Sequence, residues 1–225
     1  MSRLWPYAVL LAALLAAGGC AEEETPLAPY IQTLAEVQTD GTARPVRLLL
    51  DNGTERAVRN EATPLKADTT VRANVLYTEQ PDGGAWLTSY ATVLTPQVAA
   101  YAAEKVITDP LTLMACWKGG DYINLHLALK GTNGNAHYFG FHREALLTNP
   151  DGSRTLCTVL LHDQHGDPPY YTRETYLALP LRPLAQTLRS GRDSLRLSVT
   201  TDTGVVRRTF PFQLVQNQNP DATGL

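Results

Sequence analysis

Hydrophobic and polar residues alternate in short runs along the chain after Thr25, and turn-forming residues separate these runs. A period of two is typical of β-strands that bury one face. In the first half, the alternation predicts strands over residues 31–39, 45–51, 70–80, 85–94 and 105–108. The plainest turn is Pro81-Asp82-Gly83-Gly84, which predicts a hairpin. Short strands with little helix favour a small barrel, so we predict an OB-like β-barrel over residues 30–109.

A second series of alternating runs follows Asp109-Pro110, where the residue before proline is disfavoured in a helix. This series begins at Leu111 and predicts seven short strands, including those over residues 122–129, 137–143, 154–162, 172–179, 194–200 and 205–212. Residues 184–188 are compatible with one helical turn. Seven short strands favour a β-sandwich, which we predict over residues 110–215. The polar segment 216–225 is predicted to be a disordered tail.

The first residues of the chain are typical of an export signal. Arg3 precedes a run of Leu and Ala over residues 4–17, which is shorter than the roughly 20 residues of a membrane span. A charged start, a short apolar run and small residues favour a secretory signal peptide. Ala17-Gly18-Gly19-Cys20 resembles the lipobox of bacterial lipoproteins, in which the cysteine is acylated and becomes the first residue. We therefore predict a signal peptide over 1–19, lipidation of Cys20 and a tether over 20–29.

Three glutamates follow the predicted lipidation site. Glu22, Glu23 and Glu24 resemble the acidic signal that some Gram-negative bacteria place after the lipidated cysteine to export lipoproteins to the cell surface. Two or more acyl chains anchor a protein stably, so the membrane is a predicted partner through the lipid on Cys20. We predict an outer-membrane lipoprotein that faces the cell surface. A periplasm-facing lipoprotein, with the glutamates as a solvated spacer, is the alternative.

Charge and cysteine content exclude some classes of protein. Of 19 Lys and Arg residues, only Arg3 lies in the predicted signal, so 18 remain against 22 Asp and Glu residues. The chain has no block of basic residues, which argues against a nucleic-acid partner. Cys116 and Cys157 remain after Cys20 is set aside. In an exported protein they form either a disulfide or two small buried thiols.

Several patterned segments resemble those of the NigD-like lipoproteins. They include LLLDNGTERAV (48–58), TTVRANVLYTEQPDGGAWLTSYATVLT (69–95) and CWKGGDYINLHLAL (116–129). The resemblance covers nearly all of the chain after the signal, including the lipidated start. It implies an OB-like barrel followed by an immunoglobulin-like β-sandwich and an association with a bacteriocin operon. It brings no catalytic signature.

All five histidines fall between His126 and His165, which makes this the candidate region for a metal site. The segment from His162 to Asp167 places imidazole and carboxylate groups close together, and zinc binds both. Alternation, however, sends His137 and His142 to opposite faces of one strand. We therefore interpret the histidines as surface and strand-end residues and expect no metal and no cofactor. The chain also lacks the Gly-x-Ser-x-Gly motif of a nucleophile elbow, so no catalytic residue is predicted.

Exposed aromatic residues are the remaining candidates for function. Tyr170 and Tyr171 follow two prolines in a loop, and Trp86 follows the predicted hairpin turn. Aromatic residues with one solvated end are common at interfaces. We predict a non-catalytic envelope lipoprotein that acts as a binding or interaction module for a protein or a glycan. The alternatives are a metal-dependent hydrolase that uses His162 and His165, and a bacteriocin-associated accessory or immunity protein.

Overall fold

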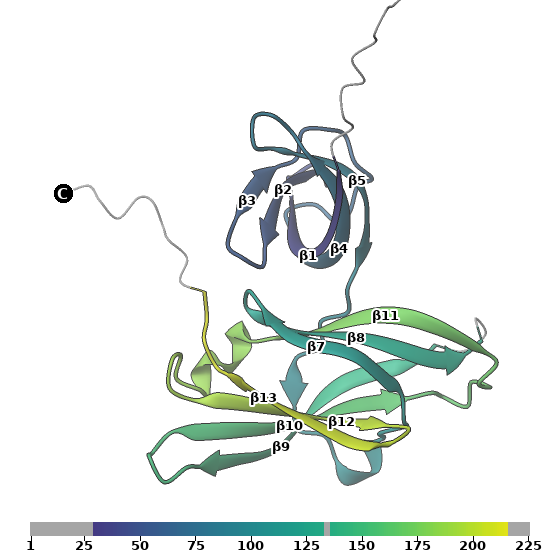
Figure 1. The fold of residues 1–225 in the computed structure, drawn as a ribbon, viewed down its shortest axis with the longest axis vertical. Coiled ribbons are helices and arrows are strands. Elements are labelled where there is room, and N and C mark those ends of the chain that lie inside the picture. The colour runs from purple at the N-terminus through teal and green to yellow at the C-terminus, as the bar shows by residue number, and fades with distance from the viewer. Residues whose placement is uncertain (1–28, 133–135, 216–225) are drawn as a thin grey trace, which may run out of the picture.

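The computed structural model describes residues 29–132 and 136–215, and within these ranges the chain is all-β. It forms thirteen strands and two short 3₁₀ helices, η1 (Ala103–Lys105) and η2 (Arg182–Gln186), as Figure 1 shows. The all-β prediction is therefore confirmed. In the described part of the chain, no helix has the length and apolar character needed to cross a membrane.

The N-terminal half forms one antiparallel sheet of five strands in the order β3-β2-β1-β4-β5. Small and branched apolar side chains, such as Ala35, Val37 and Val75, are buried on its concave face. The sheet curls on itself (Figure 1). Its strands are β1 (Tyr30–Thr39), β2 (Pro45–Leu50), β3 (Glu55–Ala57), β4 (Thr70–Glu79) and β5 (Ala85–Thr92).

An OB-like β-barrel was predicted for this half, but the sheet does not close into a barrel. β3 has only three residues, and the chain beyond it meets β5 through a single bridge between Val58 and Ala85. One bridge cannot replace a ladder of paired residues, so the sheet stays open at its edges. The strand predicted over 105–108 is wrong, because Lys105 ends η1 and Thr108 makes one isolated bridge to His162.

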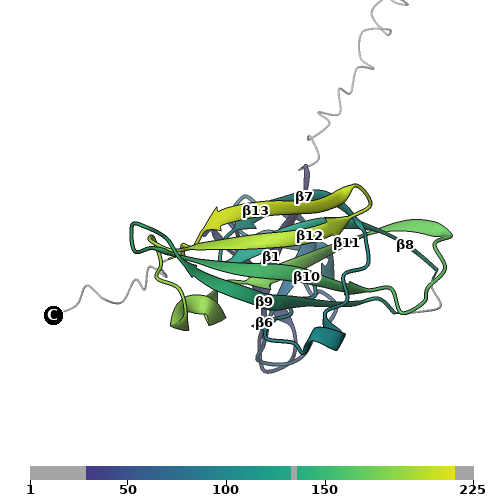
Figure 2. The ribbon, with the colours of Figure 1, turned by 90° about the horizontal axis from the view of Figure 1, so that it is seen from below.

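The C-terminal half is a sandwich of two sheets (Figure 2), as the sequence predicted. One sheet has the order β13-β12-β10-β9-β6 and the other β11-β8-β7. Leucines at alternate positions of β8, from Leu125 to Leu129, pack against Phe141 and Leu160 of the facing sheet. The strands are β6 (Val98–Ala99), β7 (Thr112–Gly119), β8 (Tyr122–Gly131), β9 (Tyr138–Thr148), β10 (Arg154–Asp163), β11 (Tyr171–Pro180), β12 (Ser194–Thr201) and β13 (Gly204–Pro211).

The structure shows where the sandwich begins and the state of its two cysteines. Val98 of β6 pairs with Phe141 of β9, so a strand before the predicted division at Asp109-Pro110 already belongs to a sheet of the sandwich. Cys116 and Cys157 are both free, and they lie on different sheets. Burial raises the pKa of the Cys116 thiol to about 11, which disfavours the reactive thiolate.

Candidate functional site

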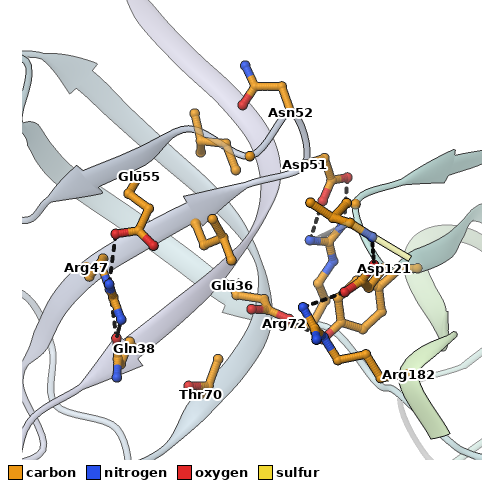
Figure 3. A pocket seen from close by; sticks show the side chains of 16 residues that line it. Glu36, Gln38, Arg47, Asp51, Asn52, Glu55, Thr70, Arg72, Asp121 and Arg182 are labelled. Carbon is orange, nitrogen blue, oxygen red and sulfur yellow. Dashed lines mark hydrogen bonds and ion pairs between the residues drawn. The ribbon is translucent and has the colours of Figure 1, made fainter. Parts of the chain in front are cut away.

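A cleft of about 1270 Å³ lies between the N-terminal sheet and the sandwich (Figure 3). At its centre, the guanidinium of Arg72 on β4 forms a bidentate ion pair with Asp51, with distances of 2.6 Å and 2.7 Å to the two carboxylate oxygens. Arg72 is 3% exposed. It also donates to Oδ1 of Asn124 on β8, at 3.0 Å. Arg72 therefore links the two halves of the protein through buried, charge-assisted hydrogen bonds.

The turn between β7 and β8 also contacts Asp51. The N–H of Gly120 donates to the carbonyl of Asp51 at 3.1 Å. A Cβ atom on Gly119 would overlap the Asp51 carboxylate and lie 2.7 Å from Nδ2 of Asn124. Gly120 has a φ of +54°, which L-residues rarely adopt. The turn therefore needs glycine at position 119 for the close approach to Asp51 and at position 120 for the backbone conformation. We call Asp51, Arg72, Gly119, Gly120 and Asn124 the joint.

The charges around the joint are paired within the protein. Tyr122 donates to Glu36 at 2.7 Å and lies under the guanidinium of Arg72, 4.4 Å from the ring centroid. Burial, with the neighbouring Glu36, raises the pKa of Tyr122. Arg182 pairs with Asp121 at 2.6 Å, as the dashed line in Figure 3 shows. Because these charges are already paired with one another, the cleft fits the role of an interface between two parts of the chain better than that of a ligand site.

A second buried polar cluster lies at one end of the sandwich. Nδ1 of His137 is 2.9 Å from Nε2 of His162, and Nε2 of His137 is 3.2 Å from a carboxylate oxygen of Asp167. Nδ1 of His162 contacts the carbonyl of Asp109 at 2.9 Å. The N–H of Thr132 donates to Asp167 at 2.6 Å, and its hydroxyl donates to the other carboxylate oxygen. We call Asp109, Thr132, His137, His162 and Asp167 the histidine network.

This network corrects the interpretation of His137 and His162 as separate surface or strand-end residues. The side chains of His137 and Asp167 are 1% and 0% exposed, and His162 is 2% exposed. Phe139 pairs with His162 across β9 and β10, which brings the residues just before β9 beside the end of β10. The register of the two strands therefore creates a contact that alternation within one strand does not reveal.

Hydrogen-bond roles determine the protons of the network. The Asp109 carbonyl only accepts, so Nδ1 of His162 carries the proton. Burial lowers the pKa of His162, which keeps this ring neutral and makes its Nε2 an acceptor for Nδ1–H of His137. The hydrogen bond from Thr132 lowers the pKa of Asp167, which keeps this carboxylate ionised and facing the other nitrogen of His137. His137 therefore faces His162 with one ring nitrogen and the carboxylate of Asp167 with the other.

The other histidines lie apart from this network. His126 contacts Glu174 at 2.8 Å and stacks on Tyr176, and His142 accepts from the N–H of Tyr101. The rings of His165 and Tyr138 form a T-shaped contact, with 5.3 Å between their centroids. Within the described ranges, no three His, Cys, Asp or Glu side chains are placed to hold a metal ion. His162 and His165, on which the hydrolase alternative rests, belong to no such group.

Exposed tyrosines stand close along the chain to residues of the histidine network. Tyr170 and Tyr171 are 76% and 72% exposed, and Tyr138 is 56% exposed. Tyr138 pairs with Asp163 at the end of β10, and Tyr171 begins β11 four residues after Asp167. We call Tyr138, Tyr170 and Tyr171 the tyrosine end. Two of its three members were predicted from the sequence, whereas Tyr138 was missed because it stands at the start of an ordinary alternating strand.

The other predicted site residues are elsewhere. Trp86 is 51% exposed on β5 of the N-terminal sheet, so it does not join the tyrosine end. Cys20, Glu22, Glu23 and Glu24 lie outside the described residues. The joint was missed altogether, because Asp51 and the two glycines resemble ordinary turn residues and Asn124 lies on the polar face of its strand.

The fold defines a class: an all-β protein in which a curled five-stranded sheet precedes a two-sheet β-sandwich. Residues 94–212 match the NigD-like C-terminal beta sandwich domain. The chain therefore belongs to the NigD-like family, and the resemblance seen in the sequence is confirmed. No curated protein matches the chain in sequence.

Solved structures of bacterial proteins share the fold. A NigD-like immunity protein from Bacteroides caccae is 23% identical, with a TM-score of 0.62 over 81% of this chain and 92% of that one. A protein described as toxin-related, from Parabacteroides distasonis, is 18% identical, with a TM-score of 0.63 over 82% and 94%. A protein described as a lipoprotein, from Bacteroides fragilis, is 11% identical, with a TM-score of 0.61 over 84% and 100%. At these identities the likeness is one of fold.

Proposed function

We propose that this NigD-like protein is a lipid-anchored, non-catalytic binding protein of the cell envelope, which contacts its partner through the tyrosine end. The exposure of Tyr138, Tyr170 and Tyr171 above a buried, fully hydrogen-bonded network carries this proposal. Tyrosines supply a large apolar surface and a polar tip, which suits contact surfaces. A scaffold that is already ordered lowers the entropic cost of binding.

Anchoring in the envelope is supported by the start of the chain. Ala17-Gly18-Gly19-Cys20 resembles a lipobox, and Glu22 to Glu24 resemble a surface-export signal. The similar protein from Bacteroides fragilis is described as a lipoprotein. We propose that Cys20 holds the protein on the outer membrane with its folded part at the cell surface. A periplasm-facing position is the alternative.

A non-catalytic role is supported by the state of the buried histidines. Both ring nitrogens of His137 and of His162 already face partners in the protein. A general base must instead reach the proton that it removes from a substrate. We therefore propose a structural role for the network, in which it holds the chain beneath the tyrosine end.

Cross-linking in intact cells tests the binding role. We expect the unmodified protein to form a defined cross-linked adduct in the envelope, and Tyr170→Ala with Tyr171→Ala to remove it. Tyr30→Ala is the matched control, because Tyr30 is 67% exposed but belongs to the N-terminal sheet. The proposal fails if the double variant, folded and lipidated, forms the same adduct in the same amount.

A second candidate function is immunity to, or another accessory role for, a bacteriocin. It is supported by two proteins of similar fold, one described as an immunity protein and the other as toxin-related. Deleting the gene and exposing the cells to culture supernatants of related strains tests it. Sensitivity that the unmodified gene restores would favour immunity, whereas unchanged growth in all supernatants would remove this candidate.

A further inference from the structure

Arg173 on β11 is a cation without a partner in the described part of the chain. Its side chain forms none of the ion pairs or hydrogen bonds found there, and its Nε is buried without an acceptor. Its neighbour Glu174 already contacts His126, and Asp167 is held by Thr132 and His137. A half-buried guanidinium without an anion is costly unless a ligand supplies one.

Arg173 lies on the same face of β11 as Tyr171. The two residues are separated by one position, and side chains of a strand alternate between faces. This face continues inward as Thr175, Leu177 and Leu179, which pair with the core-facing residues of β8. Along the core-facing side of β11, the residues thus change from Leu177 and Leu179 inside the sandwich to Arg173 and Tyr171 at the end of the strand. Figures 1 and 2 show this end of β8 and β11 projecting beyond the facing sheet of the sandwich, which contains β13, β12, β10, β9 and β6.

We propose that the tyrosine end binds an acidic saccharide, with Arg173 taking its carboxylate and Tyr171 stacking on its ring. This inference rests on the proposed function and adds the chemical class of the ligand. The guanidinium presents paired N–H donors that match the two oxygens of a carboxylate. A sugar ring presents C–H groups on one face, which pack on the electron-rich face of an aromatic ring.

The size of the site favours a saccharide over a protein. A stable protein interface uses about 20–30 residues on each side, whereas the groups identified here are three tyrosines and one arginine at one end of the sandwich. The preceding Pro168-Pro169 stiffens the approach to Tyr170. Asp167, just before the prolines, is held by Thr132 beyond the end of β8. The site is therefore ordered before its ligand arrives.

Calorimetry with the purified full chain in detergent tests the inference. The probes are tetragalacturonate and sialyllactose, with methyl-esterified tetragalacturonate and lactose as neutral counterparts and hexaglutamate as an acidic peptide. We expect at least one acidic saccharide to bind more tightly than its neutral counterpart. Arg173→Gln should remove this preference, a loss of roughly 10-fold or more in affinity. Tyr171→Ala should weaken binding of both members of the pair.

Two further variants separate the ligand contact from folding and from general charge. Arg207→Gln is the control, because Arg207 is exposed on β13, away from the β8–β11 pair, and it should keep the preference. Arg173→Lys keeps the charge without the paired donors and should retain only part of it. The inference is overturned if the protein prefers no acidic saccharide, if Arg173→Gln keeps the preference, or if hexaglutamate binds more tightly than both saccharides. Loss of the cellular adduct in the tyrosine variant, without any acidic preference, would overturn the inference alone and leave the proposed function standing.

Discussion

Asp51 accepts two hydrogen bonds from Arg72, at 2.6 Å and 2.7 Å, and the same carboxylate accepts another from Asn124 at 3.2 Å. Asp51 and Arg72 belong to the N-terminal sheet, whereas Asn124 belongs to the sandwich. One carboxylate thus satisfies groups from both halves. Removing either charge of this buried joint would leave the other without its partner.

Replacing Arg72 should be strongly destabilising. Arg72→Leu removes a buried cation, leaving Asp51 without its counter-ion and Oδ1 of Asn124 without its donor. Breaking a buried pair in this way typically costs about 3–5 kcal/mol. Arg47→Leu is the matched control, because Arg47 pairs with Glu55 while both side chains are about half exposed, and such pairs contribute at most about 1 kcal/mol. Urea unfolding curves would measure both. Equal shifts of the two midpoints would contradict the importance of the joint.

Gly119→Ala should separate the two halves without unfolding either. The added Cβ overlaps the Asp51 carboxylate, so the β7–β8 turn must move away from the N-terminal sheet. We expect a larger radius of gyration by small-angle X-ray scattering and an unchanged far-ultraviolet circular dichroism spectrum. Gly41→Ala should change neither, because its Cβ would make only ordinary contacts, at 3.6 Å from Asp68. An unchanged scattering curve for Gly119→Ala would show that the turn does not set the orientation.

The sequence predicted the long strands better than the contacts between them. Alternation sent His137 and His142 to opposite faces of one strand, but it did not predict that His137 and His162 are both buried and in contact. Their contact depends on the register of β9 with β10, which a pattern within one strand does not contain. Strands β3 and β6 have three and two residues, too few to show a period.

The joint was unpredictable for a related reason. Asp51, Gly119 and Gly120 have the composition of solvent-exposed turns, and many turns need the same residues. These residues form a buried contact only because the fold places one turn against the other. Tyr170 and Tyr171 were predictable because two aromatic residues after two prolines are unusual in a loop. Arg173 was not, because its lack of a partner is a property of the folded protein.

Asp193 should make the stability of the sandwich depend on acid. Hydrogen bonds from Arg189 hold the pKa of this buried carboxylate well below 3.8, and Arg154 adds to the effect. Because the folded form binds a proton less readily than the unfolded chain, this stabilisation is complete at neutral pH and is lost as the pH falls below about 4. We expect the thermal midpoint of Asp193→Asn to be lower than that of the unmodified protein at pH 7, with the two values converging towards pH 2. A constant difference across this range would contradict the assignment.

Cys20→Ser should release the protein from membranes. The prediction follows from the lipobox-like Ala17-Gly18-Gly19-Cys20 and from the stable anchoring that acyl chains provide. Fractionation with a carbonate wash would measure it, and a variant that still pellets with membranes would refute the lipid anchor.

Replacing Glu22, Glu23 and Glu24 with alanine in a separate variant should preserve acylation but reduce protease accessibility on whole cells. Unchanged accessibility would assign these glutamates to a solvated spacer.

His162 should remain neutral in mildly acidic solution. Its pKa is lowered chiefly because burial disfavours the charged ring, and its Nδ1–H already donates to Asp109. Nitrogen-15 chemical shifts at pH 6 should therefore show a neutral ring protonated at Nδ1, although an unperturbed histidine is largely charged there, with a pKa near 6.5. The stability linked to His162 is present above pH 6.5 and falls as the pH drops, because the unfolded ring takes up a proton first. An imidazolium signal for His162 at pH 6 in the folded protein would refute the proton arrangement of the network. It would also remove the argument that the network is ordered beneath the tyrosine end.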